Sequence, residues 1–230
     1  MKKPLMFDLC CGLGGATEGF LAEGWHCIGV DIERHQYGNH RYPAQLWIQD
    51  ICTIDGAQLK DAAFLWASVP CQFFSYTSMP WSTAKALAAA VRADPERLAK
   101  ELALFNACFR IQREACEAAG RHIPMVVENV KGAQPWVGRA RWNYGSFYLY
   151  GDVPALMPIT LKASRHRNQD GHIKQGGDWF AEARKGGEGG TSASFGSKSP
   201  QRKMASAMIA KIPEPLSRHI AKTFHPGVEI

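Results

Sequence analysis

A thiol and a carboxyl group each follow a short apolar run of the chain. Cys71 comes after "LWASVP", and Glu128 comes after "MVV". A cysteine at the tip of a strand could be core filler, a metal ligand, a redox centre or a nucleophile. A carboxyl group nearby could hold or donate a proton. The surrounding sequence has to show what this pair does.

The cysteines do not follow a disulfide or zinc pattern. There are seven of them, with no C-x-x-C pair and no matching histidine spacing: Cys10, Cys11, Cys27, Cys52, Cys71, Cys108 and Cys116. We therefore predict no metal site and no disulfide framework. Apart from Cys71, we expect them to be small core residues.

A glycine-rich turn lies near the start of the chain. "FDLCCGLGG" places Gly12, Gly14 and Gly15 after a first apolar run. Glycine there lets the backbone come close to a ligand at a helix N-terminus. The full G-x-G-x-x-G pattern is not met, because Thr17 occupies the position of the third glycine.

Two acids close the next elements. Asp31 ends the run "WHCIGVD", and Asp50 ends "WIQD". Folds of this kind place an acid there to bind ribose hydroxyls, so we expect a nucleoside-containing cofactor. Caps or surface turns are the structural alternative, and on these residues alone a nicotinamide dehydrogenase stays open.

Apolar runs alternate with helical patterns over the first 130 residues. We expect strands at 4–10, 25–32, 63–69 and 123–129, with helices at 14–24 and 94–120. Fully apolar strands separated by helices predict an α/β fold with a parallel sheet covered on both faces. Because the carboxyl ends of such strands share one edge, Asp31, Asp50, Cys71 and Glu128 should line one crevice.

Positive charge is concentrated late in the chain. Residues 1–138 carry 13 basic and 14 acidic side chains, whereas residues 139–230 carry 14 and 7. This asymmetry favours a polyanionic partner for the later part. Residues 171–196 hold eight glycines and predict a loop, and two helical segments flank Pro213 and Pro215.

No apolar run approaches the roughly 20 residues of a membrane span. The start of the chain runs into the glycine turn without a cleavage-site pattern. We therefore expect a soluble, cytoplasmic protein, and a monomer.

Taken in order, these pieces resemble the DNA cytosine-5 methyltransferases, which use S-adenosylmethionine. The similarity rests on "DLCCGLGG", the acids Asp31 and Asp50, "PCQFFS" (70–75), "ENV" (128–130), an R-x-R and "IPEPLSRHIA" (212–221). It covers roughly residues 5–150 and 205–225 and is closest to short, phage-type members of restriction-modification systems. A dehydrogenase would leave Pro-Cys-Gln without a task.

The resemblance implies a Rossmann-like methyltransferase fold in three parts. Residues 1–150 would form the catalytic domain that binds S-adenosylmethionine. Residues 151–204 would form a small, basic, glycine-rich target-recognition segment, and residues 205–230 would pack back on the catalytic domain as helices. The partner is expected to be double-stranded DNA, from which the target cytosine must be flipped.

The resemblance also assigns roles around the thiol. Cys71 would add to carbon 6 of cytosine, because carbon 5 alone is too poor a nucleophile to accept a methyl group. Glu128 would relieve the negative charge that develops toward ring N3. Gln72 and Asn129 would hold the loops. Residues 72–91 would form a long loop that could close over the flipped base.

Two R-x-R sequences compete for the last catalytic position. Arg139 and Arg141 run into the apolar stretch "WNYGSFYLYG", as in the family, whereas Arg165 and Arg167 run into a turn. We therefore assign Arg139 and Arg141 to the cytosine O2 and the nearby backbone. Arg165 and Arg167 become candidate phosphate contacts.

The cofactor is assigned to the glycine turn, the two acids with their neighbours, and the residue before the thiol. These positions are Phe7, Asp8, Cys10, Gly12, Leu13, Gly14, Gly15, Asp31, Ile32, Asp50, Ile51 and Pro70. The chain departs from the family at Cys10, where a phenylalanine usually lies near the adenine. It also has Ile209-Ala210 where the family usually has Gly-Asn.

Two other functions stay open. Some relatives of the fold methylate RNA cytosine, and nothing in the sequence separates RNA from DNA. A catalytically silent DNA-binding homologue is the other alternative, although the presence of Cys71 and Glu128 argues against it.

Overall fold

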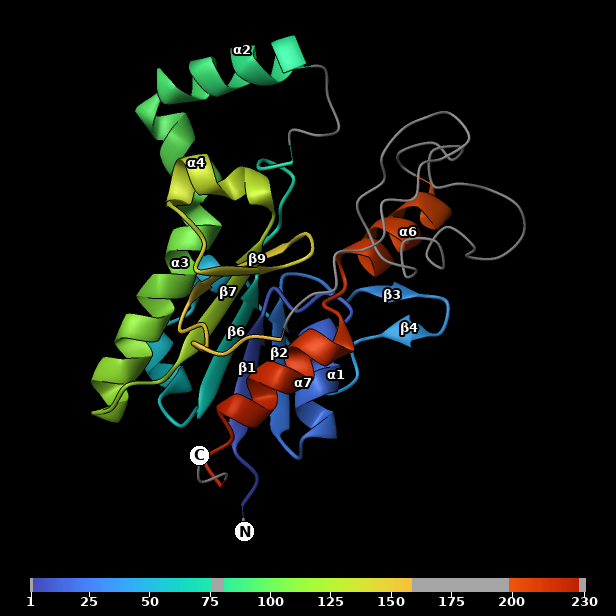
Figure 1. Cartoon of the computed structure of the whole chain (residues 1–230), viewed down its shortest axis with the longest axis vertical. Helices are drawn as coiled ribbons and strands as arrows, with labels where there is room; N and C mark the ends of the chain where they lie inside the picture. The colour runs from blue at the N-terminus through green and yellow to red at the C-terminus, as the bar shows by residue number, and fades with distance from the viewer. Residues whose placement is uncertain (1, 76–80, 159–198, 228–230) are drawn as a thin grey trace.

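The computed structural model describes residues 2–75, 81–158 and 199–227, and a seven-stranded sheet organises them (Figure 1). The strands lie in the order β5-β2-β1-β6-β7-β9-β8. They are β1 (Leu5–Leu9), β2 (His26–Asp31), β5 (Gln45–Ile48), β6 (Phe64–Ser68), β7 (Met125–Asn129), β8 (Trp142–Tyr144) and β9 (Phe147–Gly151). The first five in spatial order are parallel, and β8 and β9 form an antiparallel hairpin along β7. The predicted mostly parallel α/β fold is confirmed.

Helices cover both faces of the sheet, and this explains why the central strands are apolar throughout. On one face α3 (Pro95–Ala119) covers a core that includes Leu9 and Val127. On the other face α1 (Gly15–Ala22) and α7 (Glu214–Thr223) enclose Phe20 and Trp66. Successive side chains of a strand point to opposite faces, so both sets must be hydrophobic.

The long helix α3 begins and ends where the sequence signals predict. The Asp94 side chain accepts a hydrogen bond from Arg97 N at 3.0 Å, and Pro95 occupies the first turn. Gly120 ends the helix in a left-handed conformation with φ 63°, which glycine adopts without steric cost. The helix α2 (Trp81–Arg92) precedes it.

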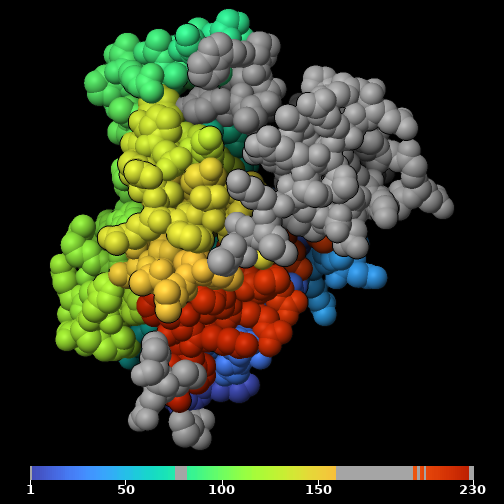
Figure 2. Space-filling model, viewed as in Figure 1, coloured from blue at the N-terminus to red at the C-terminus, as the bar shows by residue number. Residues whose placement is uncertain are grey.

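The C-terminal helices return to the N-terminal part of the chain. Helix α6 (Pro200–Ala210) leads into α7, which packs along α1. The two helices approach closely because α1 has Gly15 and Gly19 at the contact; an added Cβ at either would overlap Ile212 or Ser217. Trp25 Nε1 donates to Ala221 O at 3.2 Å. In the space-filling view α7 forms an exposed band beside residues 150–158, where His219 contacts Leu156 O (Figure 2).

Several expectations changed or fall outside the described part. Residues 72–91 are not one long loop, because residues 81–92 form α2. The strand end expected before Asp50 is β5, whereas the hairpin of β3 (Gln36–Tyr37) and β4 (His40–Arg41) was not predicted. The glycine-rich stretch 171–196, with Arg165 and Arg167 before it, lies outside the described residues. Among the described helices, none is long and apolar enough to span a membrane.

Arg110 fastens α3 to the segment that follows β5. Its guanidinium donates to Ile54 O at 2.8 Å, to Ile51 O at 3.2 Å and to Cys52 O at 3.1 Å. It also pairs with Glu114 at 2.8 Å, and Glu114 accepts a hydrogen bond from Gly56 N at 2.8 Å. The hydrogen bond from Gly56, and then Arg110, hold the pKa of Glu114 below its usual value. One side chain thus satisfies three backbone carbonyls next to Asp50.

We expect Arg110→Met to lower the unfolding free energy by about 1 to 3 kcal/mol, because it leaves these half-buried carbonyls without their donor. Chemical denaturation measures the change. Arg113→Met, one turn along on the exposed side of α3, is the matched control and should change stability by less than about 0.5 kcal/mol. Equal effects of the two substitutions would contradict the role given to Arg110.

Candidate active site

Most of the predicted site residues lie at the carboxyl edge of the sheet. Going along the sheet, this edge carries Asp50 after β5, Asp31 at the end of β2, the glycine turn after β1, Cys71 after β6 and Glu128 in β7. The chain order reverses between β1 and β6, because β2 and β5 lie on one side of β1 and β6 on the other. Open α/β sheets bind ligands at such a switch point. The glycine turn and Cys71 flank it.

Cys71 opens a tight turn at this edge. Phe74 N donates to Cys71 O at 2.9 Å, and the buried ring of Phe74 anchors the turn. The neighbouring Phe73 packs against Trp136 with ring centroids 5.0 Å apart. The thiol itself stays partly exposed, so the turn presents it at the surface of the edge and not in the core.

Glu128 lies next to β6, on the strand beside it. The register pairs Ser68 with Glu128, so the carboxyl group stands three residues before the level of Cys71. Burial raises the pKa of Glu128 to about 8. Its carboxyl group makes no hydrogen bond with the part of the chain that the structure describes. At neutral pH it is therefore a neutral acid with an O–H available to donate.

Asn129 joins the ends of β6 and β7. Its Nδ2 donates to Val69 O at 3.0 Å, and its Oδ1 accepts from Val130 N at 2.8 Å. These bonds fix the segment just before Pro70 and Cys71 against the segment just after Glu128. Gln72, predicted to hold the same loops, is exposed, as is Pro70.

The glycine turn differs in part from the expectation. Gly12 has φ 51°, and a Cβ there would meet nothing within 4 Å, so a ligand could approach. At Gly14, with φ 75°, a Cβ would meet Pro43 at 2.5 Å, and at Gly15 it would overlap Ile212. The close approach at Gly14 and Gly15 is therefore made by the chain itself. Cys10, in the same turn, has φ 54°, an uncommon conformation for a residue with a side chain.

Asp31 supports the turn and remains at the edge. Its Oδ2 accepts a hydrogen bond from Gly12 N at 2.9 Å, and its Oδ1 accepts from Ile32 N at 2.8 Å. A carboxylate has about four acceptor sites, so hydroxyl groups could still be bound. Ile32 is 69% exposed beside it, which is unusual for an isoleucine and leaves an apolar surface next to the acid. His35 lies 3.3 Å from Asp31 Oδ1.

The second acid acts locally as a cap. Asp50 Oδ1 accepts a hydrogen bond from Cys52 N at 2.9 Å and begins the 3₁₀ turn Ile51–Thr53. Ile51 is buried in the core. The capping role that the sequence left open is thus present, and a role toward a cofactor stays a prediction.

The remaining cofactor positions lie beneath the surface. Phe7 is in the core, with its ring 5.2 Å from that of Trp47, and Leu13 is buried. Asp8 is buried and accepts a hydrogen bond from Thr17 at 2.7 Å, while its Oδ1 has no partner among the described residues. Burial is the main reason that the pKa of Asp8 is raised to about 8. Thr17, at the position of the missing third glycine, holds this acid.

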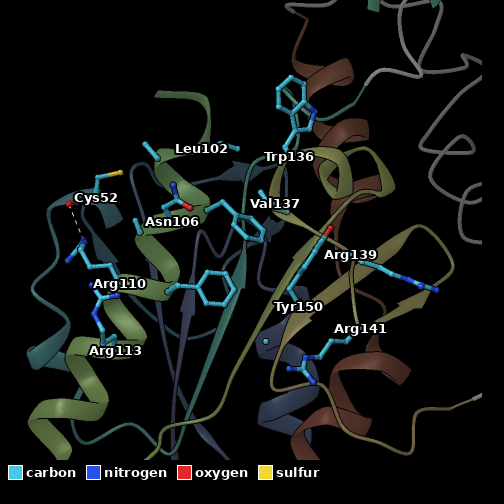
Figure 3. Close-up of a pocket in the computed structure, with 15 residues that line it drawn as sticks. Cys52, Leu102, Asn106, Arg110, Arg113, Trp136, Val137, Arg139, Arg141 and Tyr150 are labelled. Atoms are coloured by element: carbon cyan, nitrogen blue, oxygen red, sulfur yellow. Dashed lines mark hydrogen bonds between the residues drawn. The ribbon is translucent and has the colours of Figure 1, made fainter. Parts of the chain in front are cut away.

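The arginine pair lines a neighbouring cavity of about 930 Å³ between α3 and the short helix α4 (Gln134–Val137) (Figure 3). Arg139 and Arg141 lie at this cavity with Trp136 and Tyr150, whereas neither Cys71 nor Glu128 does. Leu149 pairs with Glu128 and accepts a hydrogen bond from Arg141 N at 2.9 Å. Strand β9 therefore lies between Arg141 and Glu128, and the structure places the two one strand apart.

Comparison with known proteins addresses the same residues. Residues 5–83 match the family model of the C-5 cytosine-specific DNA methylases. The resemblance found in the sequence is confirmed over this stretch, which contains the glycine turn, both acids and Cys71. No curated protein matches the sequence.

Two solved structures are similar to part of the chain. An E. coli prophage protein assigned as a DNA modification methyltransferase is 19% identical, with a TM-score of 0.38 over 57% of this chain and 33% of that one. A methyltransferase of Entamoeba histolytica is 16% identical, with a TM-score of 0.36 over 60% of this chain and 41% of that one. The chain thus spans less than half the length of either protein.

We expect the stability of the protein to fall as the pH rises from about 4 to 8, in part through Asp8. Its raised pKa means that the folded state keeps a proton that the unfolded chain releases near pH 4. This contribution is complete below that pH and is lost as the pH rises through 8. Each unit of pKa difference is worth about 1.4 kcal/mol.

Asp8→Asn removes this titration, so the variant should gain stability relative to the wild type between pH 5 and pH 9 in urea unfolding. Glu128 titrates in both proteins and cancels in the comparison. Asp61→Asn, at an exposed position, is the control and should shift stability equally at both pH values. A pH-independent difference for Asp8→Asn would contradict the buried neutral acid.

Proposed function

We propose that the protein is an S-adenosylmethionine-dependent methyltransferase that acts on carbon 5 of cytosine in duplex DNA. The observation that carries this proposal is the pairing at the edge of β6 and β7. There Cys71, which is partly exposed, follows β6, and Glu128, which is buried with its pKa raised to about 8, lies in the adjacent strand β7 opposite Ser68. The family match over residues 5–83 supports the substrate class.

The residues around the switch point fit a nucleoside cofactor. The space over Gly12 is open, Asp31 has acceptor capacity for ribose hydroxyls, and the exposed Ile32 gives an apolar surface for a base. Bound there, S-adenosylmethionine would supply an electrophilic methyl group. The phenylalanine usual in the family is replaced by Cys10, so we infer that Ile32 provides much of the apolar contact.

Cys71 acts as the nucleophile in the proposed mechanism. Its sulfur bonds to carbon 6 of the cytosine, and the electron pair of the 5,6 double bond moves toward carbon 5 and the N3 side of the ring. Carbon 5 thereby becomes reactive enough to accept a methyl group, and the sulfur–methyl bond of the donor would break to leave S-adenosylhomocysteine. When carbon 5 later loses its proton to a base, the double bond re-forms and the bond between carbon 6 and Cys71 breaks. The enzyme is regenerated.

Glu128 provides the complementary acid. Because its carboxyl group is neutral at pH 7 and has no hydrogen-bond partner among the described residues, it can donate its proton or a hydrogen bond to N3 as charge develops there. Asn129 keeps the donor and the nucleophile at a fixed separation through its bond to Val69 O. Arg139 and Arg141, near the same edge, are the proposed contacts to cytosine O2 and the DNA backbone.

We expect wild-type protein to form a covalent adduct with duplex DNA that contains 5-fluorocytosine at the target position, because fluorine at carbon 5 blocks the final proton loss. Cys71→Ser should lose the adduct and reduce methyl transfer by at least 10³-fold, since an alcohol is a much weaker nucleophile than a thiolate. Denaturing electrophoresis and transfer of radiolabelled methyl groups measure the two effects.

Cys52→Ser, which alters another exposed cysteine, is the matched control and should leave both the adduct and the activity unchanged. Structured RNA that contains 5-fluorocytosine should not be trapped. Adduct formation by Cys71→Ser would refute the nucleophile, trapping on RNA alone would refute DNA as the substrate, and no trapping of wild type would favour a silent homologue.

Methyl transfer should decline above about pH 8 because Glu128 must be protonated to donate, and its pKa is about 8. Glu128→Gln keeps a hydrogen-bond donor but cannot transfer a proton, and we expect about 10²- to 10³-fold lower activity at pH 7. The ratio of variant to wild-type activity should rise about tenfold per pH unit above 8.

Using this ratio removes any pH dependence that the two proteins share. The measurement is a pH profile of kcat from pH 6 to 10 with both substrates saturating. A ratio that stays constant across this range would show that Glu128 does not act as a proton donor.

A further inference from the structure

Tyr42 lies in the sequence between β2, which ends at Asp31, and β5, which precedes Asp50. It follows the hairpin of β3 and β4 and precedes β5, yet it is only 7% exposed. Its side chain points back into the glycine turn after β1, more than 25 residues earlier in the chain. No periodicity or motif in the sequence indicates this contact.

The ring of Tyr42 fills a notch formed by two residues without side chains. A Cβ added at Gly14 would lie 2.9 Å from Tyr42 Cδ2, and one added at Gly29 would overlap the ring. Pro43 closes the same notch, with its Cδ 2.5 Å from the position that a Cβ of Gly14 would take. The two glycines thus create a space that the Tyr42-Pro43 pair occupies.

The hydroxyl group of Tyr42 belongs to a buried series of two hydrogen bonds. Tyr42 OH lies 2.6 Å from Thr17 Oγ1, and Thr17 donates to Asp8 Oδ2 at 2.7 Å. Either hydroxyl group can be the donor in the hydrogen bond between Tyr42 and Thr17. These hydrogen bonds link Tyr42, through Thr17 of α1, to Asp8 of β1.

The turn that Tyr42 covers is conformationally demanding. Cys10, Gly12 and Gly14 all have positive φ, at 54°, 51° and 75°. Gly14 is also the N-cap of α1 and has no side chain to cap it. Such a turn keeps its shape only when its surroundings hold it. Asp31 holds Gly12 N from one side, at 2.9 Å, and Tyr42 and Pro43 hold Gly14 from another.

We propose that Tyr42 is a positioning residue for the cofactor-binding turn. By fixing Gly14 and Thr17, it keeps the open surface over Gly12 in the shape that a nucleoside cofactor needs, although it does not contact that surface. Ordering the turn in advance removes an entropic cost from binding, so the loss of this support appears as weaker affinity. The inference rests on the proposed function.

Tyr42→Phe keeps the ring in the notch and removes only the hydroxyl group. We expect the Kd for S-adenosylmethionine, and for S-adenosylhomocysteine, to rise about 3- to 10-fold, as expected for one buried hydrogen bond. The kcat at saturating cofactor should stay within about twofold of wild type, because Cys71 and Glu128 are untouched. Calorimetric titration gives the Kd without any turnover.

Tyr37→Phe is the matched control. Tyr37 lies in β3, in the hairpin that directly precedes Tyr42, and its hydroxyl group only approaches His35 at 3.5 Å. It should leave the Kd unchanged. Thr17→Val removes this hydrogen bond together with the one to Asp8, so it should weaken binding at least as much as Tyr42→Phe does, and the double variant should bind no more weakly than Thr17→Val alone. Hydrogen exchange of the Gly12 and Gly14 amides in the free protein should be faster in Tyr42→Phe than in Tyr37→Phe.

The outcomes separate this inference from the proposed function. If wild type fails to bind S-adenosylmethionine, the proposed function fails with it. If wild type binds and Tyr42→Phe binds equally well at a temperature below its melting transition, Tyr42 is only a packing residue. Should Tyr42→Phe fold poorly, Thr17→Ser against Thr17→Val decides the same question, because only valine removes the hydroxyl from the chain. Equal Kd values for those two would also overturn the proposal.

Discussion

Parallel pairing of β6 with β7, in a register that sets Ser68 opposite Glu128, is the constraint on which the site depends. In this register the carboxyl ends of both strands reach the same edge at the same level. A shift by one residue would turn Glu128 to the other face of the sheet. Buried side chains on both faces, among them Trp66 and Val127, exclude that shift. The hydrophobic core therefore determines where the acid lies relative to Cys71.

Burial acts on two carboxyl groups with different results. Asp8 and Glu128 both have pKa values raised to about 8, with burial as the largest cause. Asp8 accepts a hydrogen bond from Thr17, which is in turn hydrogen-bonded to Tyr42, and so becomes part of the support for the glycine turn. Glu128 meets no partner among the described residues and keeps its proton available at the edge. The same physical effect gives one acid a structural role and leaves the other suited to chemistry.

The supports of the edge come from distant parts of the chain. Arg110 on α3 fixes the segment after Asp50, Tyr42 covers the turn before α1, and Ser217 on α7 donates to Gly15 O at 3.2 Å. Each replaces what a longer local segment would otherwise provide. Glycines at Gly14, Gly15 and Gly19 make these contacts possible, because the partners occupy the space of a side chain. In this chain, the glycines in and after the glycine turn are therefore needed for packing.

The sequence by itself determined the elements with strong local signals and the residue types at the ends of those elements. The apolar strands around Phe7, Leu65 and Val127 and the capped helix from Asp94 to Gly120 follow from hydrophobic pattern and cap residues, which act over a few positions. Pro70-Cys71 and Glu128-Asn129 were recognisable because a residue type and a strand end coincide. The prediction of a loop over residues 72–91 was wrong where α2 (Trp81–Arg92) forms.

Tertiary structure decided what depends on contacts distant in sequence. The raised pKa of Glu128 comes from its surroundings, and neither the cavity beside Arg139 nor the notch that Tyr42 fills has a local signature. The weak edge strand β5 and the hairpin β8–β9 form because the neighbouring strands supply hydrogen bonds that these short segments cannot provide alone. Burial and shape arise only when the chain is packed, and for that reason the sequence could indicate candidate reacting groups but not the contacts that support them.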